Sequence, residues 1–179
     1  MSNPYGIIVF GLNGSGKTTL GHELARILNF KHMDHEAYAF KEAEIPYADP
    51  CSHEECIALM LADIERYHSF VISAVTGNFG EKITSMYTMA VYITVPLEIC
   101  IKRVKQRDDE RYGARVREGG DMHESRRKFV DFVASRSLAP IEQWAQKLTC
   151  PNICVDGTLD WNVNAAAIAQ RFYGIIGKE

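Results

Sequence analysis

The sequence contains no apolar run long enough to cross a membrane and no recognisable export signal. The apolar run 7–10 near the amino terminus leads straight into glycines. A membrane helix needs about 20 apolar residues, and a secretory signal needs a basic region followed by an apolar one. We therefore expect a cytoplasmic protein that does not bind membranes.

The sequence contains no Cys-x-x-Cys pair. The five cysteines are Cys51, Cys56, Cys100, Cys150 and Cys154. Their odd number and irregular spacing argue against a disulfide framework and against a zinc site. We interpret them as ordinary reduced thiols of an intracellular protein.

The chain also lacks an excess of charge of either sign. It has 20 basic and 23 acidic residues, for a net charge of -3 at pH 7. Nothing in this total indicates a nucleic-acid partner or a membrane surface. Because 179 residues, of which 46% are hydrophobic, suit one core, we expect a single domain over residues 1–179, as a monomer or homodimer.

Segments with strand character and segments with helix character alternate along the whole chain. Strands are expected over residues 6–10, 30–33, 70–75, 90–95 and 152–155. Helices are expected over 17–28, after the capping box of Ser52 and Glu55, after Pro96, around 129–133 and over 160–173. This alternation predicts a three-layer α/β/α fold with a five-stranded parallel sheet.

Residues 11–18 carry the most specific motif in the sequence. They read Gly-Leu-Asn-Gly-Ser-Gly-Lys-Thr and match every fixed position of G-x-x-x-x-G-K-[ST], between an expected strand and an expected helix. Such glycines let backbone N–H groups surround a phosphate, and a helix start adds positive potential. A plain turn has no need of Lys-Thr at this offset. The expected nucleotide-binding residues here are Gly11, Asn13, Gly14, Ser15, Gly16, Lys17, Thr18 and Thr19.

Other motifs of P-loop proteins are missing. No Asn-Lys-x-Asp string occurs, which argues against a GTPase, and the strand expected over 70–75 ends without an acidic residue. The Mg²⁺ that Thr18 would bind must then use another carboxylate. The nearest candidate is Asp34, just after the second strand. A helix N-cap is the alternative role for Asp34, and His35 beside it is either a contact to the phosphate acceptor or simply solvated.

At this point the chain resembles the nucleoside-monophosphate-kinase-like superfamily of small P-loop kinases, which includes adenylate, shikimate and gluconate kinases. The resemblance rests on the P-loop 11–18 and on Asp34. It implies ATP and Mg²⁺ as cofactors, with Thr18 and Asp34 at the metal. It also implies that Asp34 orients or deprotonates the acceptor, and that an acceptor region spans about residues 34–56.

Arginine is concentrated in one part of the chain. Seven of the eleven arginines lie between Arg103 and Arg127, and Arg103, Arg107, Arg111 and Arg115 are spaced by four. The superfamily carries a mobile LID segment here, which we place at about residues 108–124. By resemblance, Arg103 and Arg107 lie at its base, where one stacks on adenine and the other reaches phosphate, and Arg111 and Arg115 close over the γ-phosphate. The alternative is a solvated helix whose arginines pair with neighbouring acids.

Two further segments concern the binding of the phosphate acceptor and of the adenine base. Gly157 follows the last strand, where the superfamily borders the adenine, although a plain turn explains it equally. In nucleoside monophosphate kinases an arginine after the third strand grips the acceptor phosphate, but residues 76–80 contain none. Lys41 is an alternative clamp. The aromatic side chains of Tyr38, Phe40 and Tyr47 either stack on the acceptor or pack in the core.

These observations predict an ATP-dependent phosphotransferase that acts on a nucleoside, a nucleotide or a hydroxyl metabolite. Lys17, Asp34, Arg107, Arg111 and Arg115 are the expected catalytic residues. An ATP-binding sensor with little catalysis is the alternative. A nucleic-acid-binding ATPase would need basic and aromatic residues interleaved over one face, whereas the arginines here lie in one segment.

Overall fold

The computed structural model describes residues 4–41 and 47–177. Its centre is one sheet of five parallel strands in the order β2-β3-β1-β4-β5. The strands are β1 Gly6–Gly11, β2 Lys31–Asp34, β3 Phe70–Ala74, β4 Tyr87–Thr94 and β5 Asn152–Asp156. The α/β fold with a five-stranded parallel sheet, predicted from the alternation of segments, is confirmed.

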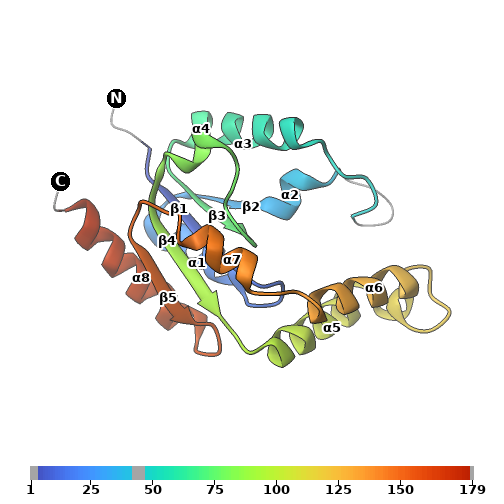
Figure 1. The fold of residues 1–179 in the computed structure, drawn as a ribbon. Helices are drawn as coiled ribbons and strands as arrows, with labels where there is room; N and C mark the ends of the chain where they lie inside the picture. The colour runs from blue at the N-terminus through green and yellow to red at the C-terminus, as the bar shows by residue number, and fades with distance from the viewer. Residues whose placement is uncertain (1–3, 42–46, 178–179) are drawn as a thin grey trace.

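Helices cover both faces of this sheet (Figure 1). The helices are α1 Lys17–Leu28, α2 His35–Ala39, α3 His53–Tyr67, α4 Glu81–Thr84, α5 Leu97–Tyr112, α6 His123–Ala134, α7 Ala139–Ala145 and α8 Trp161–Ile176, with a 3₁₀ turn η1 at Gly113–Val116. Helices α1 and α8 pack on one face, and α3, α4 and α7 pack on the other. The pair α5 and α6 projects beyond the sheet.

The side chains of strand β1 show why helices cover both faces of the sheet. Ile7 and Val9 belong to the core with α1 and α8, whereas Ile8 and Phe10 belong to the core with α3 and α7. Alternate side chains of a strand point to opposite faces, so a strand without polar residues needs apolar partners on both sides. β1 is also central: Ile8 pairs with Ile72 of β3 and with Ala90 of β4.

The local predictions agree with the structure in some places and differ in others. Ser52 and Glu55 form the predicted capping box at the start of α3. Helices α2, α4 and α7 were not predicted. Helix α5 continues to Tyr112, so the first five residues of the charged stretch 108–124 are helical rather than irregular. No helix within the described residues is long and apolar enough to span a membrane.

The topology brings the sequence motifs together at one edge of the sheet. The chain leaves β1 for α1 and returns through β2 and β3 on one side, and β4 and β5 lie on the other. Ligands of such sheets bind outside the carboxyl ends of the strands, where the strand order reverses. The loop after β1 lies at this point, with the ends of β2, β3, β4 and β5 around it.

Candidate active site

The loop between β1 and α1 depends on its glycines. Gly11, Gly14 and Gly16 have φ angles of 148°, 81° and 96°, which residues with a Cβ rarely adopt. Space is also limited: a Cβ at Gly14 would overlap the backbone carbonyl of Cys100 in α5, and a Cβ at Gly11 would lie 2.6 Å from the carbonyl oxygen of Ile93. The sequence therefore brings α5 against the P-loop.

Ser15 fits an anion in this loop. Its side chain is buried, and its Oγ has no hydrogen-bond partner within the described residues. A buried hydroxyl without a partner is rare in a folded protein. The loop leads directly into α1, whose first N–H groups also lack intrahelical partners. The loop thus offers several donors to a phosphate group and no side chain of negative charge.

Lys17 is the cation of the loop. Its Nζ donates a hydrogen bond to the carbonyl oxygen of Leu12 at 2.7 Å. Burial lowers the pKa of Lys17 to about 8, and the carboxylates of Glu36 and Asp34 act in the opposite direction. The side chain is therefore held close to the phosphate-binding glycines, and it remains mostly charged at neutral pH.

Thr18 and Asp34 meet beside the loop. The Thr18 hydroxyl donates to Oδ2 of Asp34 at 3.0 Å, and Oδ1 of Asp34 accepts the backbone N–H of Glu36 at 3.1 Å. Asp34 is thus the N-cap of α2, and its other oxygen still faces Thr18. A hydroxyl and a carboxylate oxygen at this distance suit Mg²⁺, which binds few protein ligands and keeps waters and phosphate oxygens for the rest.

A cavity of about 540 Å³ opens over these residues. It brings together most of the candidate side chains from the P-loop, from the end of β2 and from α5. The site residues predicted from the sequence that line this cavity are Asn13, Gly14, Gly16, Lys17, Thr18, Thr19, Asp34, Arg103, Arg107 and Arg111. Residues without a specific prediction also line it, among them Glu36, Ser73 and Phe129.

Arg103 connects this cavity with a second one of about 330 Å³. Its guanidinium donates to the carbonyl oxygens of Ser15 at 3.4 Å and Gly157 at 3.0 Å. The second cavity is lined by Ser15, Gly16, Thr19, Leu20, Ile93, Arg103, Gly157, Leu159, Trp161 and Asn164. Backbone carbonyls, an arginine and an aromatic ring suit a flat polar ring system, which agrees with the expected place of Gly157.

The remaining arginines of the segment are mostly paired with acids. Arg115 donates to Asp121 at 2.7 Å, outside the cavity, and Arg117 donates to Asp109 at 3.1 Å. The structure therefore does not bring Arg115 to the other candidate residues. Arg107 does line the cavity; its Nε is buried without a hydrogen bond in the described part of the chain and lies 3.7 Å from Oδ1 of Asp108.

Sequence reasoning missed two neighbours of the P-loop. Arg136, between α6 and α7, donates to Oδ1 of Asn13 at 2.8 Å. Ser73, at the end of β3, donates to the carbonyl oxygen of Lys17 at 3.0 Å and contacts His32. Only the position of Ser73 in the sequence could have indicated it, because Ser73 lies near the end of the strand where P-loop ATPases carry a metal-binding acidic residue. No local pattern marks Arg136.

The acceptor candidates fall in different places. His35 and Phe40 line the cavity, with the His35 ring 5.0 Å from that of Phe79, and burial lowers the pKa of His35. Tyr38 instead donates to Asp63 at 2.6 Å and packs on the core. Lys41 does not line the cavity. Part of the acceptor region, residues 42–46, lies outside the described residues.

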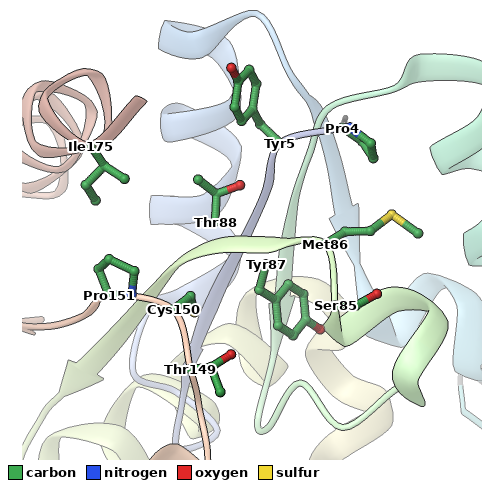
Figure 2. Close-up of a pocket in the computed structure, with 10 residues that line it drawn as sticks. All are labelled: Pro4, Tyr5, Ser85, Met86, Tyr87, Thr88, Thr149, Cys150, Pro151 and Ile175. Carbon is green, nitrogen blue, oxygen red and sulfur yellow. The ribbon is translucent and has the colours of Figure 1, made fainter. Parts of the chain in front are cut away.

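A further cavity, of about 600 Å³, lies elsewhere (Figure 2). It is near the amino ends of β1, β4 and β5, at the opposite end of the sheet from the P-loop. Figure 2 shows Tyr5, Tyr87 and Ile175 among its lining side chains. None of the described residues that line it is charged, so these residues offer no counter-charge to a phosphate.

A family model described as an AAA domain matches residues 7–128 of the chain. The chain belongs to this AAA domain family. The matched part includes β1, the P-loop, Asp34 and the arginines of α5. An uncharacterized protein, YqaC, from Bacillus subtilis (strain 168) is 27% identical over 171 residues, which cover 88% of this chain and 90% of that one.

Two kinases are also similar to this AAA domain protein. A shikimate kinase from Microcystis aeruginosa is 29% identical over 109 residues, which cover 56% of this chain and 57% of that one. The structure of a shikimate kinase from Acinetobacter baumannii in complex with shikimate has a TM-score of 0.58 at 18% identity, with 97% of this chain and 94% of that one covered. The predicted membership in the kinase-like P-loop superfamily is confirmed.

Proposed function

We propose that this protein transfers the γ-phosphoryl group of ATP to a hydroxyl group of a small molecule. The observation that carries the proposal is the convergence of Lys17, the Thr18–Asp34 pair and three arginines of α5 on one cavity beside a P-loop. Phosphoryl transfer needs mainly positioning and neutralisation of charge on the transferring oxygens. The kinase fold of the neighbouring structure supports the same reaction class.

Each side chain has a role that its position supports. The P-loop N–H groups and Lys17 hold the β- and γ-phosphates, and Arg107 and Arg111 face the same cavity from α5. Asp34 takes the proton of the acceptor hydroxyl while the oxygen of that hydroxyl bonds to the γ-phosphorus. The bond from that phosphorus to the bridging oxygen breaks, and ADP leaves with the electron pair.

The metal would be held by Thr18 and Asp34, whose oxygens suit Mg²⁺. When bound, Mg²⁺ supplies positive charge to the phosphate oxygens. Arg103 donates hydrogen bonds to the P-loop and to Gly157. It would therefore fix the position of the second cavity relative to the phosphates. The second cavity is the proposed place of the adenine base. Arg115 closes over the γ-phosphate only if its pair with Asp121 opens, because that pair lies outside the cavity.

The test is transfer of labelled phosphate from Mg·ATP to pooled hydroxyl compounds by wild-type protein and by Lys17→Ala. We expect at least a hundredfold loss of transfer in Lys17→Ala, because one preorganised electrostatic contact contributes about that much. Lys102→Ala, an exposed lysine on α5, should keep wild-type rates. Undiminished transfer by a folded Lys17→Ala protein would refute the mechanism. Tight Mg·ATP binding without transfer to any pool would favour the sensor instead.

A further inference from the structure

The cations and the carboxylates around the 540 Å³ cavity come from different elements. The cations come from the P-loop and α5, and they are Lys17, Arg103, Arg107 and Arg111. The carboxylates come from the start of α2, where Asp34 and Glu36 lie. The proposed function places the triphosphate on the cationic side. The acceptor must then lie against the wall that carries the carboxylates.

Glu36 is fixed on that wall. Its Oε2 accepts a hydrogen bond from the Tyr47 hydroxyl at 3.3 Å. Burial, together with the charge of Glu36, raises the pKa of Tyr47 to about 12, so the phenol keeps its proton near neutral pH and can donate it to this hydrogen bond. No hydrogen bond to Oε1 is found among the residues that the structure describes. This oxygen is available to a donor on a bound molecule.

Other described cations near this wall are engaged elsewhere. Arg126 lies 5.6 Å from the centre of the Tyr47 ring, but its guanidinium donates to both oxygens of Asp108. Hydrogen bonds with Ser52 lower the pKa of Glu55, and the charge of Lys41 adds to this effect; Lys41 is not part of the cavity lining. Arg136 is bound to Asn13, and its guanidinium packs on the Phe132 ring at 5.1 Å.

The other described groups on this wall are mainly aromatic. His35 lines the cavity, with its ring centre 5.0 Å from that of Phe79. Residues 76–80, after β3, include no arginine or lysine. Phe40 and Phe129 add apolar surface to the lining. The described acceptor wall therefore combines carboxylates with aromatic rings. Arg107 also lines the cavity and lies close enough to Tyr47 to act on the pKa of that phenol, but the proposed function assigns this arginine to the γ-phosphate.

We propose that the acceptor is a polyhydroxy compound, with or without an amino group, that carries no acidic group, and that Glu36 selects it. Hydroxyl or ammonium donors of the acceptor bind Oε1 of Glu36, whereas a carboxylate or phosphate there meets like charge. Like charges without a counter-ion are an established way to reject a wrong ligand. This inference rests on the proposed function and names its substrate class.

The experiment compares acceptors that differ mainly in charge. ADP formation is measured with glucose, glucosamine and gluconate, with a nucleoside and its 5′-monophosphate, and with shikimate as a further acid. We expect kcat/KM for the best neutral or amino acceptor to exceed that for its acidic counterpart at least tenfold. Preferred use of gluconate, shikimate or the nucleotide overturns the inference and leaves the proposed function standing. Transfer to none of them, nor to broader pools of each charge class, overturns both.

Glu36→Gln identifies the residue responsible, because the amide keeps the size of the side chain and removes its charge. We expect the preference for uncharged acceptors to fall at least tenfold through improved kcat/KM for the acids, while kcat for neutral acceptors changes only a few fold. Glu65→Gln, on the exposed side of α3, is the matched control and should leave the preference unchanged. An equal loss with every acceptor in Glu36→Gln would mean a structural role only and would overturn the assignment.

Discussion

At Lys17, burial and the neighbouring charges have opposite effects on the pKa of the side chain. Desolvation favours its neutral form, and the carboxylates of Glu36 and Asp34 favour the ammonium form. Its pKa of about 8 leaves it mostly charged at pH 7 and mostly neutral at pH 9. A phosphate group binds the charged form, so proton uptake and nucleotide binding are linked at this one side chain.

The corresponding prediction concerns the pH dependence of Mg·ATP affinity. Below pH 8 the ammonium is present in free protein, and affinity should be nearly constant. Above pH 8 each binding event must also bind a proton, so the dissociation constant should rise by up to about tenfold per pH unit. Isothermal titration calorimetry between pH 6.5 and 9.5 measures this rise. Lys17→Met should bind weakly at every pH, and the same upward slope in that variant would assign the titration to another group.

Helices α5 and α6 form the element on which the arginines of the site depend. Arg126 of α6 donates to both oxygens of Asp108 in α5, at 2.8 and 2.9 Å, and both side chains are buried. The Arg126 guanidinium also packs on the Phe129 ring at 4.5 Å. Arg107 and Phe129 line the cavity, so this ion pair joins the two helices directly behind the site.

Loss of one partner of this pair should destabilise the protein strongly. Arg126→Met leaves the Asp108 carboxylate buried without its donor, which costs about 3–5 kcal/mol. The double variant Asp108→Leu/Arg126→Met removes both charges and should recover much of that loss. Urea unfolding followed by circular dichroism measures each step. Arg127→Met, in an exposed pair with Glu124 on the same helix, should leave the unfolding midpoint almost unchanged. Additive losses in the double variant would refute a coupled pair.

At the scale of the whole molecule, the close packing of α1 on the sheet holds the P-loop in place. Gly21 of α1 lies directly over β2 and β3. A Cβ at this position would overlap the Ser73 hydroxyl and approach Nε2 of His32 to 3.0 Å. The Ser73 hydroxyl also donates to the carbonyl oxygen of Lys17. The serine that Gly21 packs against therefore also holds the first turn of α1, directly after the P-loop. The helix can approach the sheet this closely only because residue 21 has no side chain.

Two glycine substitutions test this packing. Gly21→Ala should lower the free energy of unfolding by about 1–3 kcal/mol, because the added methyl group meets atoms that cannot move without losing a hydrogen bond. Gly174→Ala is the matched control, since Gly174 lies exposed in α8 with open space at its Cβ. It should stabilise the protein by up to about 1 kcal/mol through higher helix propensity. Equal effects at the two sites would contradict the packing argument.

The fold could be predicted from the sequence because its determinants are local. Strands β1, β3 and β4 are largely apolar runs, and the P-loop identifies the first crossover. Helices α2, α4 and α7 were not predicted because they have five, four and seven residues, too few for a helical period to show. The contact of Arg136 with Asn13 joins residues 123 positions apart, and nothing near either residue encodes it. The roles of the site residues remain predictions.

The carboxylates at the start of α2 also bear on the release of product. On the proposed function, the acceptor enters beside Asp34 and Glu36 uncharged or cationic and departs with a phosphate of its own. That group then lies between the cations of the P-loop and α5, which attract it, and the carboxylate of Glu36, which repels it. Repulsion by Glu36 weakens the binding of the phosphorylated product, so accumulated end product should inhibit the wild-type protein less than the Glu36→Gln variant.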